Sequence, residues 1–188
     1  GAKVLHPATI QPAVGRNIPV RILNSRRAEA PGTLITAERP PSDRPLSALA
    51  SKKHVTVVDI TSTRMLMAHG FLRRLFEVFE RHRTAVDVVT TSEVSVSVTV
   101  DDTRRLSEFA EVACEPAMAI VCAVGEGLQQ DPTLVGQVLQ AVGDVPVRLL
   151  SQAASRRNIT FVIAEADVPK VLGRLHDHFF AAAGAARA

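Results

Sequence analysis

Tryptophan and tyrosine are absent from this sequence of 188 residues, in which phenylalanine occurs seven times. Proteins bind single-stranded nucleic acids on exposed aromatic side chains, whereas most of these phenylalanines recur at the spacing of helix cores. Charge is not concentrated either, because 22 basic and 19 acidic residues give a net charge of +3 and the Arg-Arg pairs are scattered. The sequence therefore predicts no nucleic-acid partner.

Long apolar runs and paired cysteines are missing as well. No stretch of about 18 apolar residues occurs, so the sequence predicts no membrane span and no membrane partner. The two cysteines, Cys114 and Cys122, form no C-x-x-C pair, which is typical of a reduced protein without disulfides. The first residues show no signal-peptide pattern and no initiating methionine, so we expect a cytoplasmic protein whose sequence is part of a longer chain.

Motifs that announce catalysis are also absent. The sequence contains no phosphate-binding loop of the G-x-x-x-x-G-K-S/T or G-x-G-x-x-G type and no nucleophile elbow. Gly125-Glu126-Gly127 is too short a pattern to indicate more than a turn. His176 and His178 are two residues apart on a predicted helix, where they point to different faces and have no third ligand nearby. We predict no catalytic residue, no metal site and no cofactor in this chain.

Apolar periodicity predicts a repeated α+β unit. A helix over 71–82 has apolar residues at 71, 72, 75, 76 and 79, and the same spacing returns about 63 residues later from 134 to 142. A further helix is expected from Asp101-Asp102-Thr103 to about Glu111, and another over 168–179, capped by Asp167. Strands are predicted over 18–23, 55–60, 86–91, 94–100, 118–124, 145–151 and 158–164.

This order of elements is β-α-β-β-α-β twice, the arrangement of two ferredoxin-like units. Because each unit leaves a sheet edge unpaired, we expect the units to pack side by side and the protein to form a dimer. Before them, four prolines lie between Pro31 and Pro45 and predict a linker, since proline suits neither a helix interior nor a central strand. Ordered structure should resume near Leu46.

One segment has the chemistry of a ligand site. The turn from Met65 to Gly70 leads into a helix that begins at Phe71, where unpaired backbone N–H groups attract an anion. Asp87 and the run Thr91-Ser92-Glu93, on the next predicted strand and turn, add hydroxyls and two carboxylates. A free amino acid, preferably a basic one, fits these charges. On patterning alone the plainer interpretation is favoured, in which the two acids are solvated strand-end residues.

Two stretches contain longer motifs. The first is Val86-Asp87-Val88-Val89-Thr90-Thr91-Ser92-Glu93-Val94-Ser95-Val96, with Phe71-Leu72 after Gly70. It resembles the first ACT domain of bacterial aspartate kinases of the lysine-sensitive type. Upstream, Lys3-Val4-Leu5-His6-Pro7-Ala8-Thr9-Ile10 is similar to the end of their catalytic domain. Single-chain kinases and the aspartokinase half of a fused aspartokinase–diaminopimelate decarboxylase both fit the resemblance.

The resemblance implies a regulatory region with tandem ACT domains. Its parts would be a kinase-domain remnant at 1–23, a linker at 24–50, an effector-binding ACT domain at 51–115 and a second ACT domain at 116–188. It also implies feedback inhibition of aspartate phosphorylation by an end-product amino acid, L-lysine first, bound at the ACT interface of a homodimer. ATP and Mg²⁺ would serve only the kinase domain, so the resemblance implies no enzymatic activity in this chain itself.

The resemblance also implies a set of effector-binding residues. They are Met65, Ala68, Gly70, Phe71, Leu72, Val86, Asp87, Thr91, Ser92 and Glu93. Backbone N–H groups near Gly70 would bind the ligand carboxylate, and Asp87 with Ser92 and Glu93 its ammonium groups. The sequence departs from the lysine-sensitive pattern at Met67-Ala68-His69 and Ala85, and each hydrogen bond lost there costs about two- to tenfold in affinity. The alternative function is a structural dimerisation module without a ligand site.

Overall fold

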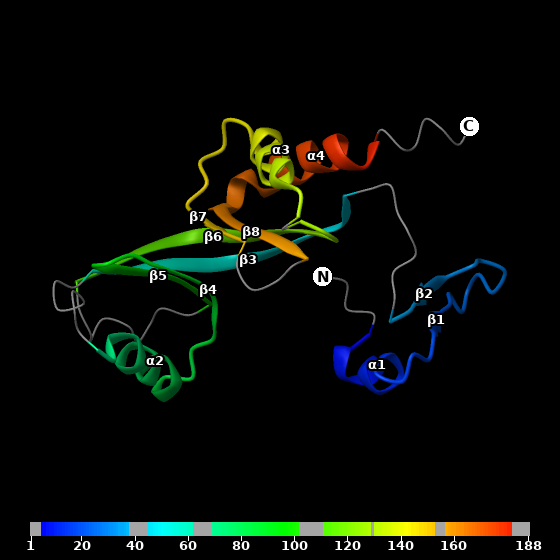
Figure 1. Ribbon diagram of the computed structural model, residues 1–188, viewed down its shortest axis with the longest axis horizontal. Coiled ribbons are helices and arrows are strands. Elements are labelled where there is room, and N and C mark those ends of the chain that lie inside the picture. Colours follow the sequence, from blue (N-terminus) through cyan, green and yellow to red (C-terminus); the bar gives the residue numbers. More distant parts are fainter. Residues whose placement is uncertain are drawn as a thin grey trace. The chain divides into compact units, whose positions relative to one another are not determined.

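The structure is a computed structural model that describes residues 5–37, 45–61, 69–101, 111–128, 130–152 and 157–181. The chain divides into two compact units, Gly1–Asp43 and Arg44–Ala188. The smaller unit contains α1 (Pro7–Val14) and an antiparallel pair of short strands, β1 (Val20–Ile22) and β2 (Thr33–Ile35) (Figure 1). Strand β2 lies within the stretch predicted as a linker, because the prolines of that stretch flank the strand and do not interrupt it.

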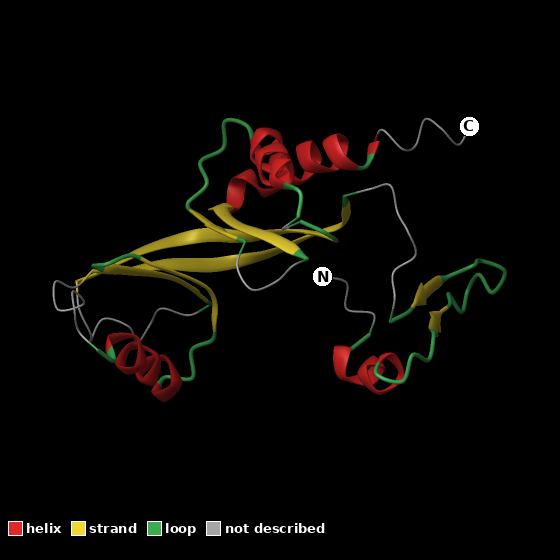
Figure 2. Cartoon of the chain, viewed as in Figure 1, coloured by secondary structure: helices red, strands yellow, loops and turns green. Residues whose placement is uncertain are grey.

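The larger unit is built on one six-stranded antiparallel sheet with the strand order β4-β5-β3-β6-β8-β7. Figure 2 shows helices on both sides of this sheet. Its elements are β3 (Leu46–Thr61), α2 (Phe71–Arg81), β4 (Val86–Thr91), β5 (Ser95–Val100), β6 (Glu111–Gly125), α3 (Pro132–Val142), β7 (Leu149–Ser151), β8 (Asn158–Ala164), the 3-10 turn η2 (Glu165–Asp167) and α4 (Val168–Phe179).

The central strands β3 and β6 are shared by two halves of the larger unit. The α2 half consists of 55–61, 111–115, β4, β5 and α2. The α3/α4 half consists of 46–52, 118–125, β7, β8, α3 and α4. Each half thus takes one part of the β3–β6 ladder, in which residues far apart in the sequence are paired.

The predicted α+β fold is confirmed, but its two units are not consecutive. The first strand of the α3/α4 half, 46–52, precedes the whole α2 half in the chain and pairs with the last part of β6. The α2 half is therefore inserted between the first and second strands of the α3/α4 half. As a consequence, the unit boundaries expected after Ala50 and after Glu115 both fall inside a strand.

Both central strands bend where the halves meet. His54 in β3 and Ala117 in β6 have positive φ angles of 61° and 57°, and the register of the ladder shifts on both sides of Val55. Extra residues of this kind bend a strand and increase its twist. The edge strands β4 and β7, at opposite ends of the strand order, contact each other as a result. The inner faces of the two half-sheets share one apolar cluster. Figure 1 shows α2 on one side of the sheet and α3 and α4 on the other.

Three apolar clusters hold these layers together. Leu75 and Phe79 of α2 pack on the outer face of their half-sheet, and Val138 and Val142 of α3 occupy the corresponding positions on the other side. This correspondence confirms the repeated helix pattern. The cluster between the two half-sheets consists of Val55, Val57, Val88, Met118, Ile120, Leu149 and Val162. Burying each large aliphatic side chain contributes about 1.5–3 kcal/mol, so this inner cluster favours the folded-over sheet.

Most other predicted elements are confirmed with changed ends. Strands 86–91 and 158–164 match, whereas the strand predicted over 145–151 is shortened to β7. Asp131 caps α3 as its side chain accepts from the Thr133 N–H at 2.8 Å. Asp167 occupies the N-cap position of α4, as predicted, but its side chain makes no capping bond and the residue also belongs to η2. The helix predicted after Asp101 lies outside the described residues, except at Glu111, which is already in β6.

The bend in β6 leads to a testable prediction. Ala117→Gly should raise the free energy of unfolding by up to about 1 kcal/mol, because glycine adopts positive φ without the steric cost that a Cβ brings. Ala113→Gly in the same strand is the matched control and should be destabilising, because Ala113 is not among the described residues with positive φ. Thermal unfolding followed by circular dichroism measures both. A lower melting temperature for Ala117→Gly would contradict the strained-bend interpretation.

Candidate functional site

The predicted site residues lie at two ends of the α2 half. Asp87 is near the start of β4 and Thr91 at its end, four residues and therefore roughly 13 Å along an extended strand. The β4–β5 turn with Ser92 and Glu93 follows Thr91. Figure 1 shows α2 beginning near this turn and leading, at its last residues, into the start of β4. Within one chain, the structure therefore brings the first turn of α2 toward the β4–β5 turn and leaves Asp87 at the opposite end.

The first turn of α2 is open to solvent. Gly70 precedes it with a positive φ of 80° and, as a glycine, provides no side-chain cap; among the described residues no heavy atom lies within 4 Å of the position of an added Cβ. Leu72 is exposed, while Phe71 packs against the core beneath α2 together with Val86. The N–H groups at such a helix end attract anions. Met65 and Ala68, also predicted for the site, lie outside the described residues.

The Ser92 side chain forms its hydrogen bonds within the β4–β5 turn. The Ser92 hydroxyl lies 2.6 Å from that of Ser95 and accepts from the Ser95 N–H at 3.1 Å. These bonds hold the turn in shape, so Ser92 positions its neighbours. Thr91 and Glu93 are exposed on either side of it. Their hydroxyl and carboxylate are therefore accessible to a ligand or to a second protein chain.

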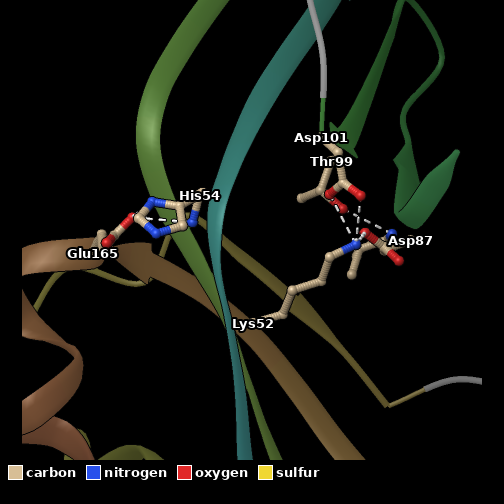
Figure 3. Close-up of polar contacts among 7 residues, drawn as sticks. Lys52, His54, Asp87, Thr99, Asp101 and Glu165 are labelled. Carbon is tan, nitrogen blue, oxygen red and sulfur yellow. Dashed lines mark hydrogen bonds and ion pairs between the residues drawn. The ribbon is translucent and has the colours of Figure 1, made fainter. Parts of the chain in front are cut away.

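Asp87 is held by a lysine from the other half of the sheet. Lys52 Nζ lies 2.6 Å from Oδ2 of Asp87 and 2.8 Å from Oδ1 of Asp101 (Figure 3). Lys52 sits at the end of the first part of β3, next to the bend at His54. At the bend itself, His54 approaches Glu165, whose Oε2 is 3.1 Å from the imidazole Nδ1 (Figure 3).

The two carboxylates raise the pKa of Lys52 above its ordinary value of 10.5, the hydrogen bond to Asp101 most and that to Asp87 next. The stability from this interaction is fully present below the unfolded-state pKa and is lost as the pH rises through the raised folded-state pKa. Lys52 is consequently an ammonium ion throughout the physiological pH range. Solvent reduces the energy of the contact, because Lys52 and Asp87 are 43% and 34% exposed.

A second ionic cluster crosses between the halves. Arg148, next to β7, donates from Nε to Glu115 at 2.9 Å and from its guanidinium to Asp59 of β3. Arg148 corresponds roughly to Asp87 in the repeat, so the α3/α4 half carries a cation near the position where the α2 half carries an acid. Periodicity singled out neither Lys52 nor the ion pairs of Arg148. Their acidic partners lie 33 to 89 residues away, a separation at which local pattern contains no signal.

Other chemistry is absent from the described part of the chain. No group of three or more histidine, cysteine or acidic side chains among those residues is placed to hold a metal ion. The helices that the structure describes are all too short or too polar to cross a membrane. Cys114 is exposed and Cys122 half-buried, and both are free thiols.

The insertion topology and the helix-backed half-sheets define the class of this protein. Residues 121–179 match the ACT domain family. A C-terminal regulatory domain assigned to aspartate kinase from Porphyromonas gingivalis w83 is 33% identical, with a TM-score of 0.62, and the alignment covers 71% of this chain and 96% of that one. The chain belongs to the aspartokinase family, in which it is a regulatory ACT region.

Two longer relatives extend the match to both units. Aspartokinase 1, chloroplastic, of Arabidopsis thaliana is 38% identical over 96% of this chain and 35% of its own length. Escherichia coli aspartokinase III, solved in complex with lysine and aspartate in the T-state, is 34% identical, with a TM-score of 0.81 over 96% of this chain and 43% of that one. The chain thus spans less than half the length of these two relatives.

The Arg148 cluster gives a stability prediction. Arg148→Met should lower the free energy of unfolding by about 1 kcal/mol, because it leaves Asp59 and Glu115 without their cation in a partly exposed setting. A loss of this size lowers the melting temperature by about 2–4 °C. Arg73→Met is the control, since Arg73 pairs with Glu77 on the exposed face of α2 and should contribute under about 0.5 kcal/mol. Equal effects of the two substitutions would contradict a bridge between the halves.

Proposed function

We propose that this region binds a cationic amino acid, L-lysine first, between the β4 strands of two identical chains, and that binding regulates an attached aspartate kinase. The observation that carries the proposal is the division of the predicted site between the two ends of β4. Antiparallel pairing of β4 with a second copy, centred near Val89, sets Asp87 of one chain opposite Thr91 of the other. A two-fold axis thereby completes two equivalent sites from parts that one chain keeps apart.

The edge of β4 suits such pairing. Among the described strands, β4 is hydrogen-bonded on one side only, to β5, and an unpaired edge is a template for another strand. Val89 on β4 and Val94 in the following turn are exposed apolar side chains, 38% and 42% accessible. Their burial against a second copy would favour association through the hydrophobic effect.

The charges of the assembled site match lysine. One chain supplies the N–H groups of the first turn of α2, for the α-carboxylate, and Glu93, for one ammonium group. The other chain supplies Asp87 for the second ammonium group. The E. coli relative, solved with lysine and aspartate, supports the choice of lysine as the first ligand to test. Regulation follows if lysine binds one arrangement of the kinase subunits more tightly than another, since only a difference in affinity shifts the equilibrium.

Calorimetry tests the ligand, because a chain without tryptophan and tyrosine is nearly silent to ultraviolet probes. We expect saturable heat with L-lysine, and at least tenfold weaker binding for Asp87→Asn, which removes a charge-assisted hydrogen bond without changing shape. Asp177→Asn, the same change on the exposed face of α4, should bind like the wild type. Threonine, methionine and diaminopimelate complete the panel. Wild-type affinity in Asp87→Asn would refute the site.

A second experiment tests the interface. Val89→Lys places a charge on the exposed edge of β4 and should yield a monomer in light scattering that no longer binds L-lysine. Leu150→Lys, at a residue of similar exposure on the other edge strand β7, is the matched control and should remain a dimer. A monomeric Val89→Lys variant, together with no heat from any amino acid in the wild type, would favour the structural dimerisation module instead.

A further inference from the structure

Asp87, the residue on which the proposed ligand site most depends, already holds an ammonium group. Lys52 Nζ is 2.6 Å from Asp87 Oδ2, at the distance and with the chemistry of a bound lysine ligand (Figure 3). The side chain that supplies it comes from β3, on the α3/α4 half, and reaches across to β4. Lys52 therefore stands in for the cationic end of an effector while remaining attached to the protein.

A second carboxylate gives this internal ammonium somewhere else to bind. Asp101, which follows β5, approaches Lys52 Nζ with both oxygens, at 2.8 and 3.0 Å. An ammonium group has three N–H donors and can leave Asp87 while retaining Asp101. The three charged groups together carry one net negative charge, so an additional cation is attracted to them, while two ammonium ions on one carboxylate oxygen would repel each other.

We propose that the Lys52 ammonium is an internal competitor for Asp87, which a cationic effector must displace toward Asp101 before it binds. This inference rests on the proposed function, because it concerns the same carboxylate. As a consequence, Lys52 lowers the affinity of the site for a cationic effector. Ligand binding is also linked to the contact between the two halves, since displacement of Lys52 breaks an ion pair from β3 to β4 beside the bend in β3.

Four variants test the competition by titration with L-lysine in the calorimeter. Lys52→Met keeps the aliphatic stem and removes the charge, and should bind L-lysine about two- to fivefold more tightly, the range expected for a partly exposed ion pair. Lys52→Arg retains a cation and should bind like the wild type. Lys53→Met makes the same charge change at the exposed neighbouring residue and should also match the wild type. Lys52→Gln repeats the test should the methionine variant unfold.

Asp101 provides a prediction of the opposite sign. Asp101→Asn removes the alternative partner, so Lys52 holds Asp87 more firmly and L-lysine should bind about two- to fivefold more weakly. In the Lys52→Met background the same substitution should have little effect. This double-mutant cycle separates competition from simple attraction by a nearby acid, which would weaken binding equally in both backgrounds.

The outcomes distinguish the two proposals. In one outcome the wild type binds L-lysine, Asp87→Asn does not, and Lys52→Met binds no more tightly than the wild type. This result overturns the competition and leaves the proposed function in place. A wild type that shows no heat alongside a Lys52→Met variant that binds supports the competition and overturns lysine sensing by the natural sequence. Absence of binding in every variant, with thermal unfolding showing that all are folded, overturns both proposals.

Discussion

The antiparallel pairing of β3 with β6 is the constraint on which the larger unit depends. Residues that begin the unit pair with residues 118–125, and residues that end β3 pair with the first part of β6, so one ladder belongs to two half-sheets. Its two bends, at His54 and Ala117, place the half-sheets face to face. The inner apolar cluster then becomes possible, because its side chains come from both halves and would otherwise be exposed to solvent.

Ion pairs also connect the two halves of the larger unit near these bends. Lys52 joins β3 to Asp87 and Asp101, and Arg148 joins β7 to Asp59 and Glu115. Each pair is partly exposed, so its contribution to stability is modest and sensitive to salt. Their importance is geometric, since charged partners specify how the half-sheets are arranged where apolar contacts alone are not directional. Such weak, specific contacts are suited to change when a charged ligand binds.

The proposed ligand site illustrates how a fold can hold the parts of a site without assembling it. The motif Val86-Asp87 through Glu93 occupies a single edge strand and the turn after it, and its acidic and hydroxyl groups are spread along that strand. In the proposed edge-to-edge pairing, the second copy runs in the opposite direction, which brings unlike ends together. A regulatory region of this design is therefore expected to couple ligand binding to association, because a completed site needs two chains.

Sequence by itself determined the identity of most elements and the class of the protein. Apolar residues that recur about every 3.6 positions in a helix, or every second position in a strand, mark the side that faces a core. The elements α2, α3, α4, β4 and β8 were therefore predictable from local pattern. Local pattern did not determine the inserted topology or the partners of Lys52 and Arg148, which lie 33 to 89 residues away. Only the tertiary structure decided that the Asp87 carboxylate is paired with Lys52. The physical reason is that the bends in β3 and β6, which bring distant charges together, depend on pairing across the chain and leave no local periodic signal.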